Sequence, residues 1–284
     1  MSSPFRLVPA GDRAVEIHGP GGLLLRYVFQ PDTPGDESPR PYAHPVCTLG
    51  GEVLTNFQPA DHRWHHGLNF TITTLAGYNF WGGGSYRPVD GYQWRNDHGV
   101  QRHEAWLELS ADRLAHTLEW RTGADGGVLL REERALTFAF VSSKTWTLRW
   151  QATLQNVSGR TLALGQYQSN QGLVGSHYSG LQFRGAPDLL ANPAGAVDGI
   201  FAEGDLAGEI AVHGAAAHWM EWRGRKELSG RPVTLRFANN PGPFHCFVRR
   251  NLPLAALPFQ YERDLPLAAG ATLAVDHTLT FTDA

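Results

Sequence analysis

Apolar and polar residues alternate along many segments of this chain, and a period of two residues is typical of β-strands with one buried face. The clearest run is residues 145–154, in which one face would carry Trp146, Leu148, Trp150, Ala152 and Leu154. The positions between them are mostly polar: Thr147, Arg149, Gln151 and Thr153. Residues 156–160 (Asn-Val-Ser-Gly-Arg) have the composition of a turn, and residues 161–164 are predicted to form the next strand.

Similar runs are spread over the rest of the chain, at residues 14–17, 23–29, 104–109, 114–119, 135–140, 233–238 and 272–281. Turn signals recur between them, since the chain has 32 glycines and 18 prolines. No helical stripe exceeds about two turns. We therefore predict an all-β fold, a large antiparallel two-sheet β-sandwich formed by residues 1–284 as a single domain. The proline-rich segment 31–41 is predicted to be a surface loop.

Composition narrows the classes of function. The 284 residues are 42 % hydrophobic and carry a formal net charge of −3, which leaves no basic field for nucleic acid or an anionic membrane. No apolar run approaches the roughly 20 residues of a membrane helix, and the N-terminal residues lack the pattern of a secretory signal. Cys47 and Cys246 match no metal or redox spacing. We expect a cytoplasmic protein with two reduced thiols.

Histidines gather in residues 61–68, Asp-His-Arg-Trp-His-His-Gly-Leu, which contain three of the 13 histidines. Imidazole titrates near neutral pH and can donate a proton, accept one or bind a metal. Residues 78–86, Tyr-Asn-Phe-Trp-Gly-Gly-Gly-Ser-Tyr, place aromatic residues around three consecutive glycines. Aromatic rings offer an apolar face with a polar rim, which suits the faces of sugar rings. The two segments together predict a pocket for a flat polar ligand.

The histidine segment, together with residues 40–46 and 79–83, resembles an uncharacterised bacterial family labelled "methane oxygenase PmoA-like". The likeness continues at residues 178–185, 247–249 and 267–273. The commoner motif of that family reads Asp-His-Pro-His-His-Arg-Gly, and here Trp64 replaces its second histidine and His66 its arginine. The label implies a membrane oxygenase, but this sequence has no segment that could span a lipid bilayer.

Residues 146–154, with the turn after them and residues 162–165, look like the middle of a galactose mutarotase-like sandwich. That resemblance covers about 30 residues of the chain. It implies a large antiparallel sandwich with a concave face that binds a carbohydrate.

Candidate residues follow from these segments. His62 and His65 are the candidate acid/base pair, because two histidines in different environments can hold opposite protonation states near pH 7. We expect His103, at the start of a strand, to join them in one concave cleft. Glu132 and Glu133 would point to opposite faces of a strand, which makes one of them a candidate general base. The candidates for contact with substrate are His44, Asn79, Trp81, Tyr86, Gln166 and Arg184.

The sequence thus predicts a carbohydrate-active protein, leaning towards an enzyme of epimerisation, mutarotation or elimination on a sugar or sugar derivative. Two alternatives stay open. A non-catalytic sugar-binding protein would use the same cleft. A metal-dependent hydrolase or lyase would hold a divalent cation through histidines, and the available set is His44, His62, His65 and His103. No other cofactor is expected, since nucleotide-binding glycine motifs and a Gly-x-Ser-x-Gly elbow are absent.

Overall fold

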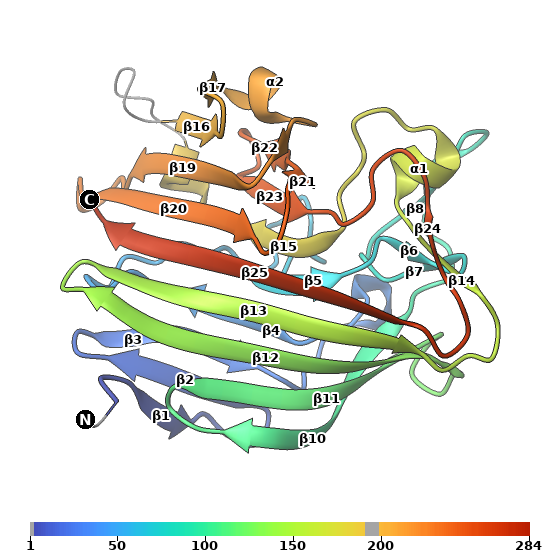
Figure 1. Ribbon diagram of the computed structural model, residues 1–284, viewed down its shortest axis with the longest axis horizontal. Helices are drawn as coiled ribbons and strands as arrows, with labels where there is room; N and C mark the ends of the chain where they lie inside the picture. The colour runs from blue at the N-terminus through green and yellow to red at the C-terminus, as the bar shows by residue number, and fades with distance from the viewer. Residues whose placement is uncertain (1–2, 191–198) are drawn as a thin grey trace.

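Two large antiparallel β-sheets pack face to face in the computed structural model, which describes residues 3–190 and 199–284 (Figure 1). The first sheet has eight strands. In spatial order they are β1 (Arg6–Pro9), β2 (Ala14–Gly19), β3 (Gly22–Val28), β4 (Tyr42–Val46), β5 (Leu68–Thr71), β15 (Gly180–Arg184), β23 (Leu254–Leu257) and β22 (Phe247–Arg249).

The second sheet has nine strands. They are β10 (Val100–Leu109), β11 (Arg113–Arg121), β12 (Val128–Ser142), β13 (Thr145–Asn156), β25 (Thr272–Asp283), β20 (Pro232–Asn239), β19 (Trp219–Arg225), β16 (Gly199–Ala202) and β17 (Leu206–Ala207). The predicted antiparallel two-sheet sandwich is therefore confirmed. The strand expected at residues 135–140 is longer than predicted, because β12 continues back through the alternating residues before it.

Smaller sheets and short helices connect the two layers. Four strands form one small sheet: β24 (Leu265–Leu267), β14 (Leu162–Gly165), β6 (Thr74–Leu75) and β7 (Tyr78–Asn79). Two strand pairs are β18 (Ala216–Ala217) with β21 (Phe244–His245), and β8 (Ser85–Arg87) with β9 (Gly91–Gln93). The helical segments of the described residues are η1 (Gly35–Glu37), α1 (Tyr167–Gln171), η2 (Pro187–Leu190) and α2 (Glu209–Val212).

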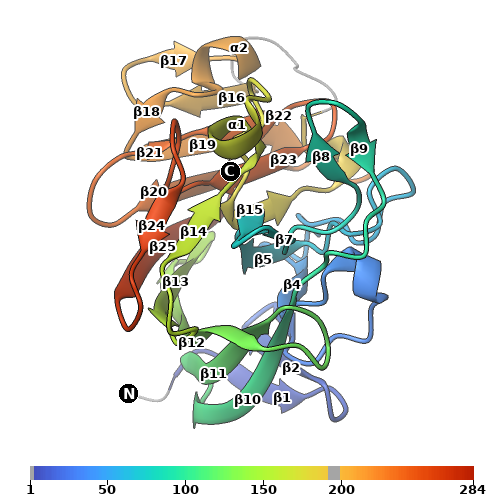
Figure 2. The same cartoon turned by 90° about the vertical axis from the view of Figure 1, so that its right-hand side faces the viewer.

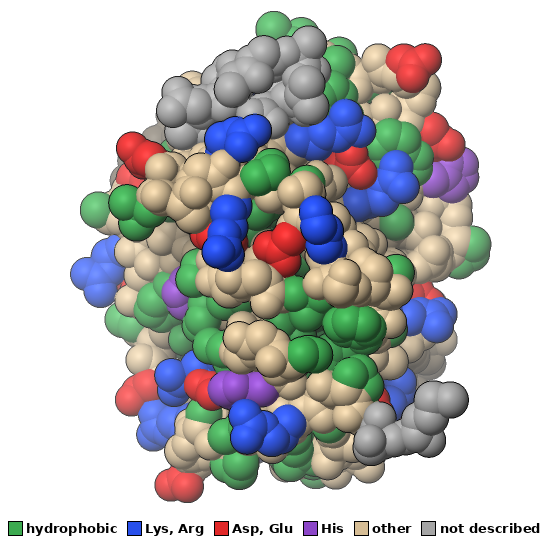
Figure 3. Space-filling model, turned by 90° about the vertical axis from the view of Figure 1, so that its left-hand side faces the viewer, with side chains coloured by type: hydrophobic (Ala, Val, Ile, Leu, Met, Phe, Trp, Pro, Cys, Tyr) green, Lys and Arg blue, Asp and Glu red, His purple; other side chains and the backbone are tan. Residues whose placement is uncertain are grey.

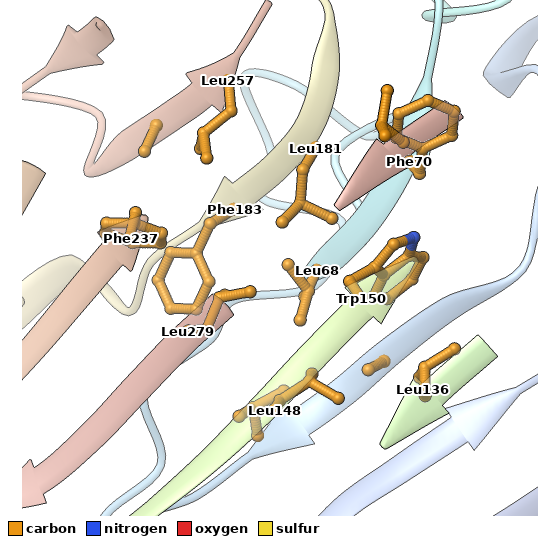
Figure 4. Packing of buried hydrophobic residues seen from close by; sticks show 14 of the residues in the cluster. Leu68, Phe70, Leu136, Leu148, Trp150, Leu181, Phe183, Phe237, Leu257 and Leu279 are labelled. Atoms are coloured by element: carbon orange, nitrogen blue, oxygen red, sulfur yellow. The ribbon is translucent and has the colours of Figure 1, made fainter. Parts of the chain in front are cut away.

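The core lies between the two large sheets, where alternation gathers the apolar side chains (Figure 4). Leu148 and Trp150 of β13 face Leu181 and Phe183 of β15, and all four side chains are fully buried. Shortening a buried side chain of this size to Ala typically costs about 2–5 kcal/mol. Because a shift by one residue would turn every such side chain outward, this burial fixes the strand register.

A polar network also lies inside the sandwich. Glu132 is buried and accepts hydrogen bonds from Arg134 Nε at 2.7 Å and from Trp120 Nε1 at 2.7 Å. Glu133 is exposed on the opposite face of β12, so the predicted alternation is confirmed. Glu132 is directed into the core and Glu133 to the solvent-exposed face of the second sheet.

The segment 31–41 is not simply a surface loop. Glu37 and Arg40 within it are buried, at 4 % and 0 % exposure. The prediction failed because these charges have partners inside the fold: Glu37 Oε2 accepts from His66 Nε2 at 2.8 Å, and Arg40 Nε donates to Asn69 Oδ1 at 2.7 Å. Buried charges are tolerated when they are paired and hydrogen-bonded in this way.

Figure 3 shows one end of the molecule, on which Lys and Arg side chains are interspersed with Asp and Glu rather than gathered by sign. Within residues 3–190 and 199–284, no helix is both long enough and apolar enough to cross a membrane. Cys47 and Cys246 are buried and unpaired with each other.

The outer face of the first sheet carries a different set of residues from the core face. On β15, Leu181 and Phe183 point into the core, so Gln182 and Arg184 alternate to the outside. On β22, Val248 joins the core, and its neighbours Phe247 and Arg249 lie on the outer face. This outer face forms the base of the candidate site.

Candidate functional site

A cleft of about 420 Å³ opens over β22 and β23 on the outer face of the first sheet. Small-molecule sites typically measure about 300–1,000 Å³. Figure 2 shows the β8–β9 hairpin beside the ends of β22 and β23, and this hairpin contributes one wall. The residues that line the cleft are His62, Trp64, His65, Trp81, Gly82, Gly84, Tyr92, Trp94, Ser176, Tyr178, Phe247, Arg249, Leu252 and Leu254.

The histidine loop, residues 57–67 between β4 and β5, forms a second wall. It closes on itself through backbone bonds from Gln58 N to His65 O at 3.0 Å and from His65 N to His62 O at 3.0 Å. Two buried charged residues, Glu37 and Arg40, hold this loop in place. Glu37 binds His66, as described above, and Arg40 Nη2 donates to Trp64 O at 2.9 Å. His66 therefore positions the loop, and His62 and His65 are left to face the cleft.

Trp64 packs directly on the glycine turn that follows β7. A Cβ atom on Gly83 would lie 2.5 Å from the Trp64 ring, and one on Gly82 would lie 2.6 Å from the Trp64 Cβ. Both glycines have positive φ, +98° and +70° for Gly82 and Gly83, which also favours glycine. Because Gly82 and Gly83 have no side chains, Trp64 can lie directly against the backbone of this turn.

Asn79 organises the same turn. Its Oδ1 accepts from Trp81 N and Gly82 N, both at 2.9 Å, and its Nδ2 donates to Gly83 O and Ser85 Oγ, both at 3.1 Å. These bonds use the hydrogen-bonding capacity of the amide. Asn79 is not among the residues that line the cleft, and its amide holds Trp81 there through these bonds.

His62 and His65 lie together, as predicted. Their rings stack with centroids 4.8 Å apart and an interplanar angle of 23°. The two environments differ. His62 is partly exposed, and its Nδ1 lies 2.8 Å from Asp61 Oδ2. His65 is 2 % exposed, and its Nδ1 is buried with no hydrogen-bond partner in the described residues.

The surroundings of His65 set its charge. Burial lowers the pKa of His65 well below its ordinary value, and the positive charges of His62 and Arg184 lower it further. Burial raises the pKa of the Asp61 carboxyl, but the hydrogen bond from His62 and nearby positive charges outweigh it, so that pKa is lowered overall. At neutral pH, His65 is an uncharged imidazole beside a histidine that bonds a carboxylate.

Aromatic rings make up most of the remaining surface. Trp81 is 4 % exposed and packs on Tyr178 at a centroid distance of 4.6 Å. Tyr178 also contacts Phe247 at 5.4 Å, and its hydroxyl lies 2.9 Å from the hydroxyl of Tyr92. The predicted placement of Trp81 in the pocket agrees with this geometry.

Two arginines belong to the cleft or its margin. Arg249 lines it directly. Arg184 is 4 % exposed, lies 3.8 Å from Asp61 Oδ1 and donates from Nη1 to Leu252 O at 3.4 Å. Burial lowers the pKa of Arg184, and Asp61 opposes that shift. Arg184 thus sits at the edge of the site, next to the Asp61–His62 pair.

His103 lies elsewhere, so the expectation that it joins His62 and His65 in one cleft is wrong. It belongs to β10, and its Nδ1 is 2.8 Å from Nδ1 of His116. Its ring packs against Phe29 and Trp106, at 4.9 and 5.0 Å. The prediction failed because β10 lies in the second sheet, whereas the histidine loop covers the first.

His44 is also separated from the acid/base pair. Its Nδ1 lies 2.9 Å from Thr55 Oγ1, its ring stacks on Phe57 at 5.6 Å, and burial lowers its pKa to about 4. It lines a different hollow, with Arg26 and Tyr42. Within the described residues, no group of three or more His, Cys, Asp or Glu is arranged to hold a metal ion. The predicted ligand set of His44, His62, His65 and His103 is thus not assembled.

Two other predicted substrate contacts have structural roles. Gln166 caps α1 by accepting from Ser169 N at 2.9 Å, and its Nε2 donates to Tyr261 O at 2.7 Å. Tyr86 packs against Tyr92 and Tyr167 at 5.2 and 6.0 Å, behind the residues that line the cleft. Gln166 and Tyr86 therefore pack and hydrogen-bond with residues around the cleft and are not among the residues that line it.

Several lining residues were not selected from the sequence: Tyr92, Trp94, Ser176, Tyr178, Phe247, Arg249, Leu252 and Leu254. They come from four parts of the chain that only the fold brings together. The available signal was the family resemblance, which runs through residues 178–185 and 247–249 and so contains Tyr178, Phe247 and Arg249.

Comparison with known proteins gives a family and distant structural similarities. A family model described as "Family of unknown function (DUF6807)" matches residues 14–284. No curated protein matches the chain. An alpha-galactosidase from Lactobacillus brevis is similar with a TM-score of 0.41 and 11 % identity, over 99 % of this chain. The alignment spans 39 % of that longer enzyme.

A GalM/aldose epimerase homologue from C. elegans is similar with a TM-score of 0.34 and 10 % identity, over 99 % of this chain and 98 % of that one. At these identities and TM-scores, neither likeness carries information on substrate or activity. The functional argument therefore depends on the cleft itself.

Proposed function

The chain belongs to the DUF6807 family, and from the geometry of its cleft we propose that it binds a sugar or sugar derivative and performs acid/base chemistry on it with His62 and His65. The observation that carries this proposal is the stacked histidine pair inside an aromatic cleft. One histidine is bonded to a carboxylate, and the other is buried and uncharged.

The lining supports a carbohydrate ligand. Trp64, Trp81 and Trp94 offer ring faces that suit the C–H faces of a sugar. Polar groups at the rim, among them Ser176 and the tyrosine hydroxyls, supply hydrogen bonds to sugar hydroxyls. A mostly aromatic pocket with a few directed polar groups is the usual form of a small-molecule site.

The histidine pair supports transfer of two protons. The Asp61 bond to His62 Nδ1 orients the ring and leaves Nε2 as the nitrogen that exchanges a proton with substrate. His65, kept neutral by burial, accepts a proton. In a mutarotation, His62 would protonate the ring oxygen while His65 removes the proton of the anomeric hydroxyl. The ring C–O bond then breaks as the carbonyl forms, and the reverse transfers after bond rotation restore both histidines.

The same geometry disfavours two other chemistries. Glycoside hydrolysis commonly needs two carboxylates that flank the scissile bond, and no Asp or Glu is among the described residues that line the cleft. The four histidines of the predicted metal set are not gathered at one place, since His44 and His103 bond to other residues, away from the stacked pair of His62 and His65.

The test combines a sugar panel with two variants. Purified protein is incubated with aldoses and sugar acids, and products are followed by proton NMR. If the histidines transfer protons, His62→Ala and His65→Ala each lower turnover by on the order of 100-fold or more. Binding of the sugar should survive in both variants, because the tryptophans remain.

Other outcomes separate the alternatives. A non-catalytic binding protein would show affinity for the sugar without turnover in the wild type. If either variant lost both a bound metal ion and its activity, the result would favour the metal-dependent alternative. Full activity in both variants would exclude His62 and His65 as the acid/base pair.

A further inference from the structure

Arg249 is held in the cleft by bonds that orient its guanidinium. Nη1 donates to Val248 O at 3.1 Å and lies 2.9 Å from His213 Nδ1, and Nη2 donates to Gly175 O at 2.8 Å. The guanidinium carbon lies 4.7 Å from the centre of the Phe247 ring. A side chain fixed at so many points is pre-organised for a ligand.

His213 acts as an uncharged acceptor for this arginine. Its Nδ1 accepts from Val248 N at 3.3 Å, so that nitrogen carries no proton, and Arg249 Nη1 lies 2.9 Å from Nδ1 and 3.1 Å from Nε2 of the ring. Burial lowers the pKa of His213, and the charge of Arg249 lowers it further. The positive charge of Arg249 is therefore not neutralised by the groups that hold it.

Two hydrogen-bond donors remain on Arg249, one on Nε and one on Nη2. The Nη1 hydrogens are directed to Val248 O and His213, and one Nη2 hydrogen is directed to Gly175 O. Nε makes no hydrogen bond within the described residues. The Nε hydrogen and the second Nη2 hydrogen are thus left for a ligand, and a planar fork of this kind suits a carboxylate.

The charges around the cleft favour an anion. Its described lining contains an arginine and two histidines but no Asp or Glu. The nearest carboxylate to Arg249 is Glu209, at 4.0 Å from Nη1, which is beyond hydrogen-bonding distance. Glu209 Oε2 instead accepts from the backbone N of Arg250 at 2.9 Å. Glu209 therefore leaves the free edge of Arg249 unoccupied.

A second guanidinium lies across the base of the site. Arg184 and Arg249 are both paired in register with Leu254, so they lie on the same outer face. Two strand spacings separate them, roughly 10 Å. Arg184 Nε is buried without a partner in the described residues, and Asp61 is its only nearby carboxylate, at 3.8 Å. The second arginine adds positive potential under the histidine pair.

We propose that the natural ligand is a sugar acid, whose carboxylate is bound by the free Nε–Nη2 edge of Arg249 while its ring lies among the tryptophans. This inference rests on the proposed function, since it names the class of sugar for the same cleft. A phosphorylated sugar presents a similar charge. The carboxylate is the better match because its two coplanar oxygens correspond to the two free donors.

Binding measurements test the assignment. We expect D-glucuronate and D-galacturonate to bind more tightly than D-glucose and D-galactose, by about 10- to 100-fold, the usual effect of a charged hydrogen-bonded pair. Titration calorimetry gives the dissociation constants, and D-glucose 6-phosphate is included to separate phosphate from carboxylate. Arg249→Gln should lower uronate affinity to that of the neutral sugar.

Two further variants keep the result interpretable. Arg250→Gln makes the same change in charge one residue away, outside the described lining, and should retain the preference for uronates. Arg249→Lys keeps the charge without the fork and should lose most of the preference. Circular dichroism checks that each variant is folded.

Equal affinity for uronates and neutral sugars would overturn the sugar-acid assignment while leaving the proposed function in place. So would a preference that persists in folded Arg249→Gln, or tighter binding of the phosphate than of either uronate. Failure of every sugar to bind would overturn the proposed function as well.

Discussion

At the scale of single residues, the chemistry of the cleft depends on a difference between two neighbouring histidines. Asp61 bonds His62, whereas His65 is buried against its own loop and its Nδ1 has no partner in the part of the chain that the structure describes. Because their rings stack at 4.8 Å, protonating both at once is unfavourable. Burial, and then a positive charge on His62, lower the pKa of His65, which therefore stays an uncharged base beside its neighbour, as an acid and a base in one reaction require.

The titration of His65 is the first prediction. Burial and the charge of Arg184 both lower its pKa, so the imidazole should stay neutral until well below pH 6.5. Removing the charge in Arg184→Gln takes away one lowering influence, and the pKa of His65 should therefore rise. NMR of the histidine rings across a pH series measures both values without any substrate.

Arg63→Gln is the matched control, since Arg63 is exposed in the same loop and its nearest carboxylate is Glu37, at 3.6 Å. It should leave the titration of His65 nearly unchanged. An unchanged or lower pKa of His65 in Arg184→Gln would show that Arg184 does not act on this histidine.

At the scale of elements, short polar anchors place the cleft on an otherwise regular sandwich. Asn79 fixes the glycine turn after β7. Trp64 of the histidine loop packs against that turn. Arg40 and Glu37 fix that loop from the segment before β4. Loops fixed by such bonds can hold side chains in position for a ligand although they are not themselves strands.

The glycine turn gives the second prediction. Gly83→Ala would force a Cβ to within 2.5 Å of the Trp64 ring at a φ of +70°, so the folded state should lose about 1–3 kcal/mol or more. Gly84→Ala is the matched control, because its Cβ would meet Tyr92 at 3.4 Å and its φ is not positive. Thermal denaturation of both variants measures the difference.

We expect a clear drop in Tm for Gly83→Ala and a small change for Gly84→Ala. Equal Tm values for the two variants would contradict the prediction. They would mean that the turn accepts a side chain at position 83 without a clash against Trp64.

At the scale of the whole molecule, a buried polar network joins the two sheets. Arg134 of β12 binds Glu132 on its own strand, donates from Nη2 to Gln101 Oε1 at 2.9 Å, and lies 3.4 Å from the hydroxyl of Tyr27 on β3. Its guanidinium carbon lies 5.1 Å from the centre of the Trp150 ring. The sandwich therefore contains a buried, hydrogen-bonded charged pair between its two sheets.

Breaking this pair is the third prediction. Arg134→Met leaves Glu132 buried without its partner, which typically costs about 3–5 kcal/mol of the free energy of unfolding. Combining it with Glu132→Leu removes both charges, so part of the stability should return. Arg131→Met, at an exposed position of the same strand, should change stability by less than about 0.5 kcal/mol.

Urea denaturation followed by tryptophan fluorescence measures all four proteins. A double variant that is as unstable as, or less stable than, Arg134→Met alone would show that the charge of Glu132 is not the source of the loss. The remaining cost would then lie with Trp120, which donates to Glu132.

The sequence by itself determined the class of fold and the location of the histidine pair. A period of two residues can be read locally, because each strand buries every second side chain, and it correctly indicated β13 and β25. His62 and His65 are three residues apart, so a single turn brings them together. Local sequence is sufficient for both results.

Only the tertiary structure decided which other residues join that pair. His103 was excluded because β10 belongs to the opposite sheet, and Arg249 was included because β22 lies at the edge of the first sheet, over which the cleft opens. Sheet order depends on contacts between segments far apart in the chain, and the composition of a single segment does not encode it. The capping bonds of Gln166 and Asn79 likewise depend on the neighbours that the fold supplies.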